Sequence, residues 1–177
     1  AIEQRQIDIY GDLLETAWLY GRGDHAIDRD TGAVLGRIAD LVCTLWRGKD
    51  AGIWEVRGED EHFTHSKVMC WVALDRAIRL AEEGDVPDGH RGRWEREAAA
   101  IEEFVNTRCW SERLQSYTRS AGSDQLDANL LMLPMVGFGD PAGDRINGTI
   151  DAVSGALRRG PFVFRYLAHD GLPGTAG

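Results

Sequence analysis

Residues 52–58 (GIWEVRG) bring an indole, a carboxylate and a guanidinium together within four positions of the chain. Glycines flank the stretch and it joins two predicted helices, so we expect a loop that opens to solvent or to a cavity. The indole of Trp54 can pack on the C–H face of a pyranose while its bulk displaces water from Glu55, which helps an acid to keep the proton that a leaving oxygen needs. Glu55 is therefore a candidate catalytic acid. A salt bridge between Glu55 and Arg57 within the loop is the alternative.

Two histidines and a lysine follow this loop. His62 and His65 have the spacing H-x-x-H, which can place two imidazoles on one side of a helix. Two histidines without further placed ligands support a metal site only weakly, so no metal is predicted. We expect one of them, taken as His65, to border the pocket of Glu55 and the other to be structural. Lys67 lies in the same neighbourhood and is grouped with the candidate substrate-binding residues, although its role is open.

A further carboxylate, Asp127, lies at the start of the apolar run 126–135, directly after Leu126. The favoured interpretation is a carboxylate at a helix N-terminus, where it offsets the helix dipole. The other interpretation places Asp127 in the interior of the site as a substrate-binding residue. The acidic run 59–61 is interpreted as a solvated loop.

Helical periodicity runs through almost the whole chain and must supply the framework for these residues. Residues 68–74 (VMCWVAL) are apolar on all sides, as in a buried helix. The other segments carry one apolar stripe, and about six helices are expected within residues 7–20, 34–45, 63–82, 94–105, 126–135 and 146–157. Helices with one apolar stripe alternate with more fully apolar ones, which indicates two concentric layers of antiparallel helices. Residues 161–167 are expected to form a short extended piece.

The composition excludes several classes of protein. The chain has 177 residues, with 20 Lys and Arg against 29 Asp and Glu, a formal net charge of −9. Such a chain lacks the clustered cations of nucleic-acid binders and of proteins held on anionic membranes. No apolar run approaches the roughly 18 residues of a membrane helix. Three cysteines, Cys43, Cys70 and Cys109, lie in apolar contexts and indicate reduced thiols in a cytoplasmic protein.

Five segments, in the same order, resemble the bacterial branch of glycoside hydrolase family fifteen, which contains glucoamylases and some trehalases. They are residues 4–11 (QRQIDIYG), residues 52–58 with 62–76 (HFTHSKVMCWVALDR), residues 126–134 (LDANLLMLP), residues 149–150 (TI), and residues 165–166 (RY) with 170–174 (DGLPG). The matches spread over nearly the whole chain, so they are far more specific than one short motif.

The resemblance implies an all-α (α/α)6 barrel with its active site at one end of the inner helices. It also implies an inverting hydrolase that releases glucose from α-glucosides and needs no cofactor. Glu55 matches the family's general acid, Trp54 a wall of the sugar site, and Arg165 a substrate-binding arginine whose planar fork can bind sugar hydroxyls. Arg57, His65, Lys67 and Asp127 complete the set of candidate substrate-binding residues.

Inversion requires a second carboxylate as general base. In the family this base follows the DGLPG segment, and other barrel helices precede the first match. We therefore expect residues 1–177 to be the central portion, about half, of one (α/α)6 catalytic domain, with the acid but without its base and inactive alone. Half a barrel exposes its inner apolar helices, so we expect association with the missing part or a homo-oligomer.

Two questions stay open from the sequence. The substrate is either a maltooligosaccharide or trehalose. The rival class of function is a non-catalytic helical scaffold, which would act as a carbohydrate-binding or interaction module.

Overall fold

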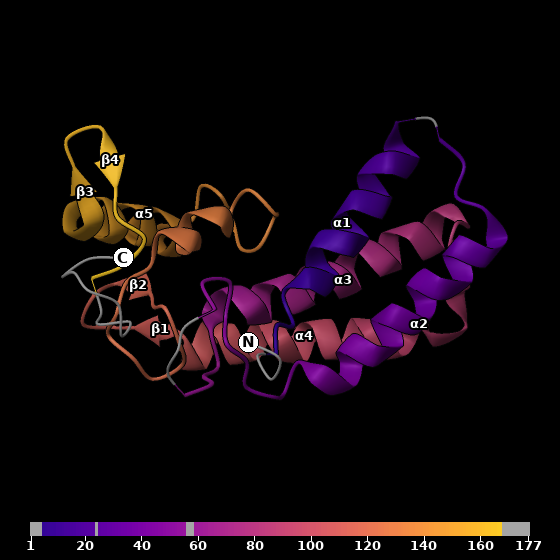
Figure 1. The fold of residues 1–177 in the computed structure, drawn as a ribbon, viewed down its shortest axis with the longest axis horizontal. Coiled ribbons are helices and arrows are strands. Elements are labelled where there is room, and N and C mark those ends of the chain that lie inside the picture. The colour runs from indigo at the N-terminus through magenta and orange to yellow at the C-terminus, as the bar shows by residue number, and fades with distance from the viewer. Residues whose placement is uncertain (1–4, 24, 56–58, 168–177) are drawn as a thin grey trace. The chain divides into compact units, whose positions relative to one another are not determined.

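The computed structural model describes residues 5–23, 25–55 and 59–167 (Figure 1). Its described residues are mostly helical, as predicted, with α1 (Ile9–Arg22), α2 (Arg29–Leu45), α3 (Thr64–Glu83), α4 (Arg91–Arg108) and α5 (Asp144–Leu157). Two short 3-10 helices, η1 (Asp88–His90) and η2 (Ala128–Met132), and two hairpins complete the described elements. The hairpins pair β1 (Trp110–Ser111) with β2 (Ser116–Tyr117) and β3 (Arg158–Arg159) with β4 (Phe162–Val163).

The chain divides into two compact units. Unit 1 contains residues 1–6, 49–65 and 104–177, and unit 2 contains residues 7–48 and 66–103.

Unit 2 is built around α3. The apolar run 68–74 forms the buried part of this helix, as expected, with only Trp71 partly exposed. Gly11 allows the close approach of α1, because a Cβ at this position would lie 2.4 Å from the carbonyl oxygen of Met69. The indole of the buried Trp94 on α4 donates to Oδ1 of Asp40 on α2 at 2.9 Å. Each of the four long helices α1, α2, α3 and α4 is thereby tied to a neighbour by a specific contact.

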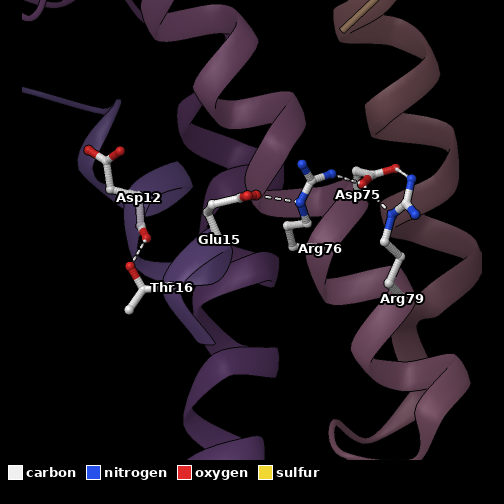
Figure 2. Close-up of polar contacts among 6 residues, drawn as sticks. All are labelled: Asp12, Glu15, Thr16, Asp75, Arg76 and Arg79. Atoms are coloured by element: carbon white, nitrogen blue, oxygen red, sulfur yellow. Dashed lines mark hydrogen bonds and ion pairs between the residues drawn. The ribbon is translucent and has the colours of Figure 1, made fainter. Parts of the chain in front are cut away.

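A charged network also connects α1 with α3 (Figure 2). Arg76 on α3 pairs with Glu15 on α1 and with Asp75 on its own helix. Arg79 donates to the same Asp75 at 2.7 Å. The guanidinium carbons of Arg76 and Arg79 lie 4.7 and 5.6 Å from the ring of Trp18, so the network covers an aromatic side chain.

Unit 1 has a core that includes α5. Backbone N–H of Tyr117 on β2 donates to the hydroxyl of Thr149 on α5 at 3.0 Å, and the ring of Tyr117 packs edge-on against Phe138. The segment 126–135, expected as a helix, forms only the five-residue η2. Asp127 caps its start, and the ring of Pro134 shortly after its end supplies no N–H to continue a helix. The extended piece expected at 161–167 is confirmed only at β4.

The three cysteines are buried free thiols in the described structure. Burial raises the pKa of the Cys43 thiol to about 11, so this group stays protonated and unreactive near neutral pH. Among the described residues, no helix has both the length and the apolar character needed to cross a membrane.

Candidate functional site

The candidate acid lies in a loop that we call the acid loop, residues 50–61. The two ends of this loop are joined by Asp50 and Glu61, each of which donates its backbone N–H to the carbonyl oxygen of the other at 3.0 Å. The next residue, Ala51, donates to the carbonyl of Arg5 at 2.9 Å. The two ends of the loop are therefore fixed to each other and to Arg5. Residues 56–58 lie outside the described residues, and with them the predicted substrate-binding Arg57.

A tight turn presents Trp54 and Glu55. Backbone N–H of Glu55 donates to the carbonyl of Gly52 at 3.1 Å, and both residues have left-handed backbones, with φ of 67° at Gly52 and 48° at Glu55. A Cβ on Gly52 would lie 2.8 Å from the ring of Phe63, so only glycine fits there. For Glu55 the left-handed conformation costs about 1–3 kcal/mol, and such strain clusters at functional sites. Glu55 is exposed to solvent.

Trp54 is anchored on Asp127, which lies 73 residues further along the chain. Its indole Nε1–H points between the two carboxylate oxygens, 3.0 Å from each. Asp127 is 0% exposed, and its Oδ1 also accepts the backbone N–H of Asn129 at 3.0 Å. The favoured interpretation of Asp127 as the carboxylate at the start of a helix is thus confirmed, although the helix is only η2. The same side chain also lies inside the site.

Hydrogen-bond donors and two arginines surround the carboxylate of Asp127. Burial raises the pKa of Asp127, while the hydrogen bonds from Asn129 and Trp54 and the charges of Arg119 and Arg165 act in the opposite direction. Nε of Arg119 lies 3.7 Å from Oδ2 of Asp127, and Arg119 is itself only 6% exposed. With no accessible surface, Asp127 is poorly placed to activate a water molecule as a general base.

Two arginines pack on the aromatic rings beside Asp127. The guanidinium carbon of Arg165 lies 5.2 Å from the ring of Trp54 and 5.7 Å from that of Tyr166, and Arg165 is exposed. Arg119 lies on Tyr166, at 4.1 Å. The carbonyl of Arg165 accepts the backbone N–H of Ala128 at 2.8 Å, which joins its segment to the residue after Asp127.

The structure therefore brings Trp54, which directly precedes Glu55 in the chain, into contact with two other predicted site residues, Asp127 and Arg165. Sequence reasoning missed Arg119 and Tyr166. Tyr166 belongs to the RY segment quoted for the resemblance, so a signal for it existed. Arg119 lies in no motif, and only its buried position beside Asp127 identifies it.

The remaining predicted residues have other surroundings. His65 is 3% exposed in the first turn of α3, while the ring of His62 packs edge-on against Phe104. Lys67, in unit 2, is buried, and its ammonium donates to the carbonyl of Trp46 at 2.6 Å and to that of Gly48. These carbonyls follow the end of α2, where a cation is favourable. Sugar binding by His65 and by Lys67 stays a prediction. For Lys67 the two backbone carbonyls at the end of α2 would compete with a sugar for the ammonium group.

The described arrangement suits a neutral sugar. It offers a partly exposed indole, an exposed carboxylate beside it and an exposed guanidinium. Glu59 and Asp60 are exposed, as expected for a solvated loop, and the carboxylate of Glu61 accepts the hydroxyl of Ser120. Within residues 5–23, 25–55 and 59–167, no group of three or more metal-ligating side chains is placed to hold a metal ion.

Comparison with known proteins gives a family match over nearly the whole sequence. Residues 1–174 match the family described as Glycosyl hydrolases family 15. The chain is 38% identical to a trehalase of Mycobacterium tuberculosis and 37% identical to a trehalase of Mycolicibacterium smegmatis, with 100% of this chain aligned in both. It is 32% identical to a trehalase of Thermoplasma acidophilum. The chain spans only 26%, 27% and 30% of the length of these relatives.

Solved structures agree on the fold. A glycosidase variant in complex with glucose matches with a TM-score of 0.79 and 20% sequence identity, over 94% of this chain and 44% of the other. The wild-type glycosidase matches equally well. At this identity the likeness concerns the fold alone, and the mostly helical structure is consistent with part of a helical glycosidase barrel.

Proposed function

This chain belongs to glycosyl hydrolases family 15, and on that basis we propose that it is the acid-bearing part of an enzyme that hydrolyses an α-glucosidic bond, with trehalose as substrate. The observation that carries the proposal is the turn 52–55, in which Trp54 is anchored on the buried Asp127 and Glu55 follows it directly. A fixed indole can pack on a sugar, and the exposed carboxylate that follows it in the chain can reach the glycosidic oxygen.

In the proposed reaction Glu55 acts as general acid. Its carboxyl gives a proton to the glycosidic oxygen, so that glucose leaves as a neutral alcohol. A base carboxylate on the opposite face of the sugar, roughly 6.5–9.5 Å from the acid in inverting enzymes, takes a proton from the attacking water. We assign this base to the remainder of the enzyme. The relatives are several times longer than this chain, and Asp127, the buried candidate within it, is occupied by protein donors.

The sugar itself is proposed to lie on Trp54, with the fork of Arg165 donating to its hydroxyls. The cation of Arg165 lies 5.2 Å from the Trp54 ring, so both can contact one ligand. Arg57 and His65 are further candidates for sugar contacts on the grounds of the sequence. Lys67 is a weaker candidate, because its ammonium already has two carbonyl partners.

The choice of trehalose over maltooligosaccharides rests on the relatives. Each of the three described above is named a trehalase, at 32–38% identity. The substrate is decided by the whole enzyme, of which this chain spans about a quarter.

For the intact molecule we propose an (α/α)6 toroid of which residues 1–177 form the central portion. Exposed apolar side chains on α1, among them Ile9 at 60% and Leu19 at 54%, support further helices or a second copy of the protein as cover for this face. A cytoplasmic location is supported by the three buried free thiols.

The test is glucose release from trehalose and from maltose by the complete gene product, with Glu55→Gln and, as matched control, Glu59→Gln. Glu59 lies in the same loop and is exposed. We expect trehalose to be the better substrate, a loss of about 10³-fold in kcat for Glu55→Gln, and wild-type rates for Glu59→Gln. Glucose release by Glu55→Gln at the wild-type rate would remove Glu55 from the mechanism. No release from either sugar by the wild type would favour a non-catalytic helical module.

A further inference from the structure

Asp127 is buried at the centre of the site but has no surface with which to touch a sugar. It is 0% exposed, both of its oxygens lie 3.0 Å from the indole nitrogen of Trp54, and Oδ1 also accepts from Asn129. A direct hydrogen bond to a substrate would require the protein around Asp127 to open, because the side chain has no accessible surface. The carboxylate therefore has its partners within the protein, and its effect on a bound sugar must pass through them.

The most consequential of these partners is Trp54. An indole has a single N–H and no acceptor, so that bond fixes the rotation of the ring about its side-chain torsions. Hydrogen bonds to a charged acceptor are roughly twice as strong as neutral ones. Trp54 is only partly buried and lies between Gly52 and Glu55, both of which have left-handed backbones.

The segment of Asp127 also holds the second predicted sugar ligand. Backbone N–H of Ala128 donates to the carbonyl of Arg165 at 2.8 Å, and the guanidinium of Arg165 lies 5.2 Å from the Trp54 ring. Residues 127–128 therefore tie together two parts of the sugar site, from the acid loop and from the segment after β4.

We propose that Asp127 is a positioning residue: it orients the indole of Trp54, and through the next peptide bond the carboxyl of Glu55, without contacting the substrate. This inference rests on the proposed hydrolase function. Arg119, 3.7 Å from Oδ2, keeps a compensating positive charge beside the buried carboxylate. Asn in place of Asp127 keeps one oxygen acceptor for the indole, and Leu of similar size keeps none.

The test is a double-mutant cycle in the complete gene product, with trehalose as substrate. The variants are Asp127→Asn, Asp127→Leu, Trp54→Phe, which keeps a ring but loses the N–H, and the double variant Trp54→Phe with Asp127→Leu. We expect Asp127→Leu to lose about 100-fold in kcat/KM, the effect of misplacing reacting groups by about 1 Å. In the Trp54→Phe background the same change should cost less than about threefold, because the bond it removes is already absent. Asp127→Asn should retain more activity than Asp127→Leu.

Asp124→Asn is the matched control, since Asp124 is an exposed aspartate three positions earlier with partners of its own, Ser111 and Arg113. It should keep wild-type kinetics. Thermal unfolding of every variant separates loss of the fold from misplacement of the site, and if Asp127→Leu does not fold, the cycle is run with Asp127→Ala, which also lacks an acceptor for the indole. Equal losses from the Asp127 change in both backgrounds would overturn the positioning role while leaving the hydrolase intact. A wild type without activity would overturn the proposed function and this inference with it.

Discussion

Asp127 and Trp54 are 73 residues apart in the chain, yet their side chains are joined by a hydrogen bond. The carboxylate is fully buried, accepts an indole and a backbone donor, and has Arg119 beside it at 3.7 Å. A buried carboxylate without such compensation would be strongly destabilising. At the scale of single residues, the site is therefore a balance between the desolvation of Asp127 and the donors around it.

Replacement of Arg119 by Met tests this balance. Burial raises the pKa of Asp127 above its ordinary value of 3.8, so deprotonation of this group costs more in the folded state than in the unfolded chain. The stability linked to this group is present below its unfolded pKa and is lost as the pH rises through the folded pKa. Without Arg119 the folded pKa rises further. Arg119→Met should therefore lower the free energy of unfolding by about 1–3 kcal/mol at about pH 7, and by less at about pH 4.

Urea unfolding of the complete protein at the two pH values measures this difference. Arg113→Met is the control, because Arg113 is exposed and pairs with Asp124 at the surface. An Arg119→Met variant whose loss of stability is the same at both pH values would show that Asp127 does not respond to this cation.

At the scale of elements, the acid loop depends on one close contact. A Cβ on Gly52 would meet the ring of Phe63 at 2.8 Å, and its φ of 67° is unfavourable for other residues. Gly122 has a similar φ of 74° but open space around it. Gly52→Ala and Gly122→Ala thus share the backbone strain, about 1–3 kcal/mol, and differ in the clash.

Gly52→Ala should reduce glucose release from trehalose by about 10-fold to 100-fold, because the turn that carries Glu55 must shift to relieve the clash. Gly122→Ala should change only the melting temperature. Initial rates and thermal unfolding of both variants in the complete protein provide the comparison. Equal activities of the two variants would mean that the contact between Gly52 and Phe63 does not position the acid.

The elements that the sequence predicted well are those decided by local pattern. The run 68–74 is buried because apolar residues face every side of that helix, and the stripes predicted the remaining long helices. The prediction of a helix over the run 126–135 was wrong in its length, because Asp127 and Pro134 restrict the helix to η2. Arg119 and the contact between Trp54 and Asp127 could not be predicted, since both arise from segments distant in sequence.

At the scale of the whole molecule, this chain corresponds to only part of the length of its relatives. It spans about a quarter of the trehalases to which it is similar and 44% of a solved glycosidase that shares its fold. Glu55 is proposed as the acid of that enzyme, and its partner base is assigned to the rest of it. Activity is therefore a property to be measured in the complete gene product.

The measurement that tests the role of Glu55 most directly compares two substrates in the Glu55→Gln variant of the complete enzyme. Trehalose needs a proton on its leaving oxygen, whereas α-glucosyl fluoride releases fluoride with little help from an acid. If Glu55 is the general acid, the variant loses about 10³-fold in kcat on trehalose but less than about 10-fold on the fluoride. Equal losses on the two substrates would contradict that assignment.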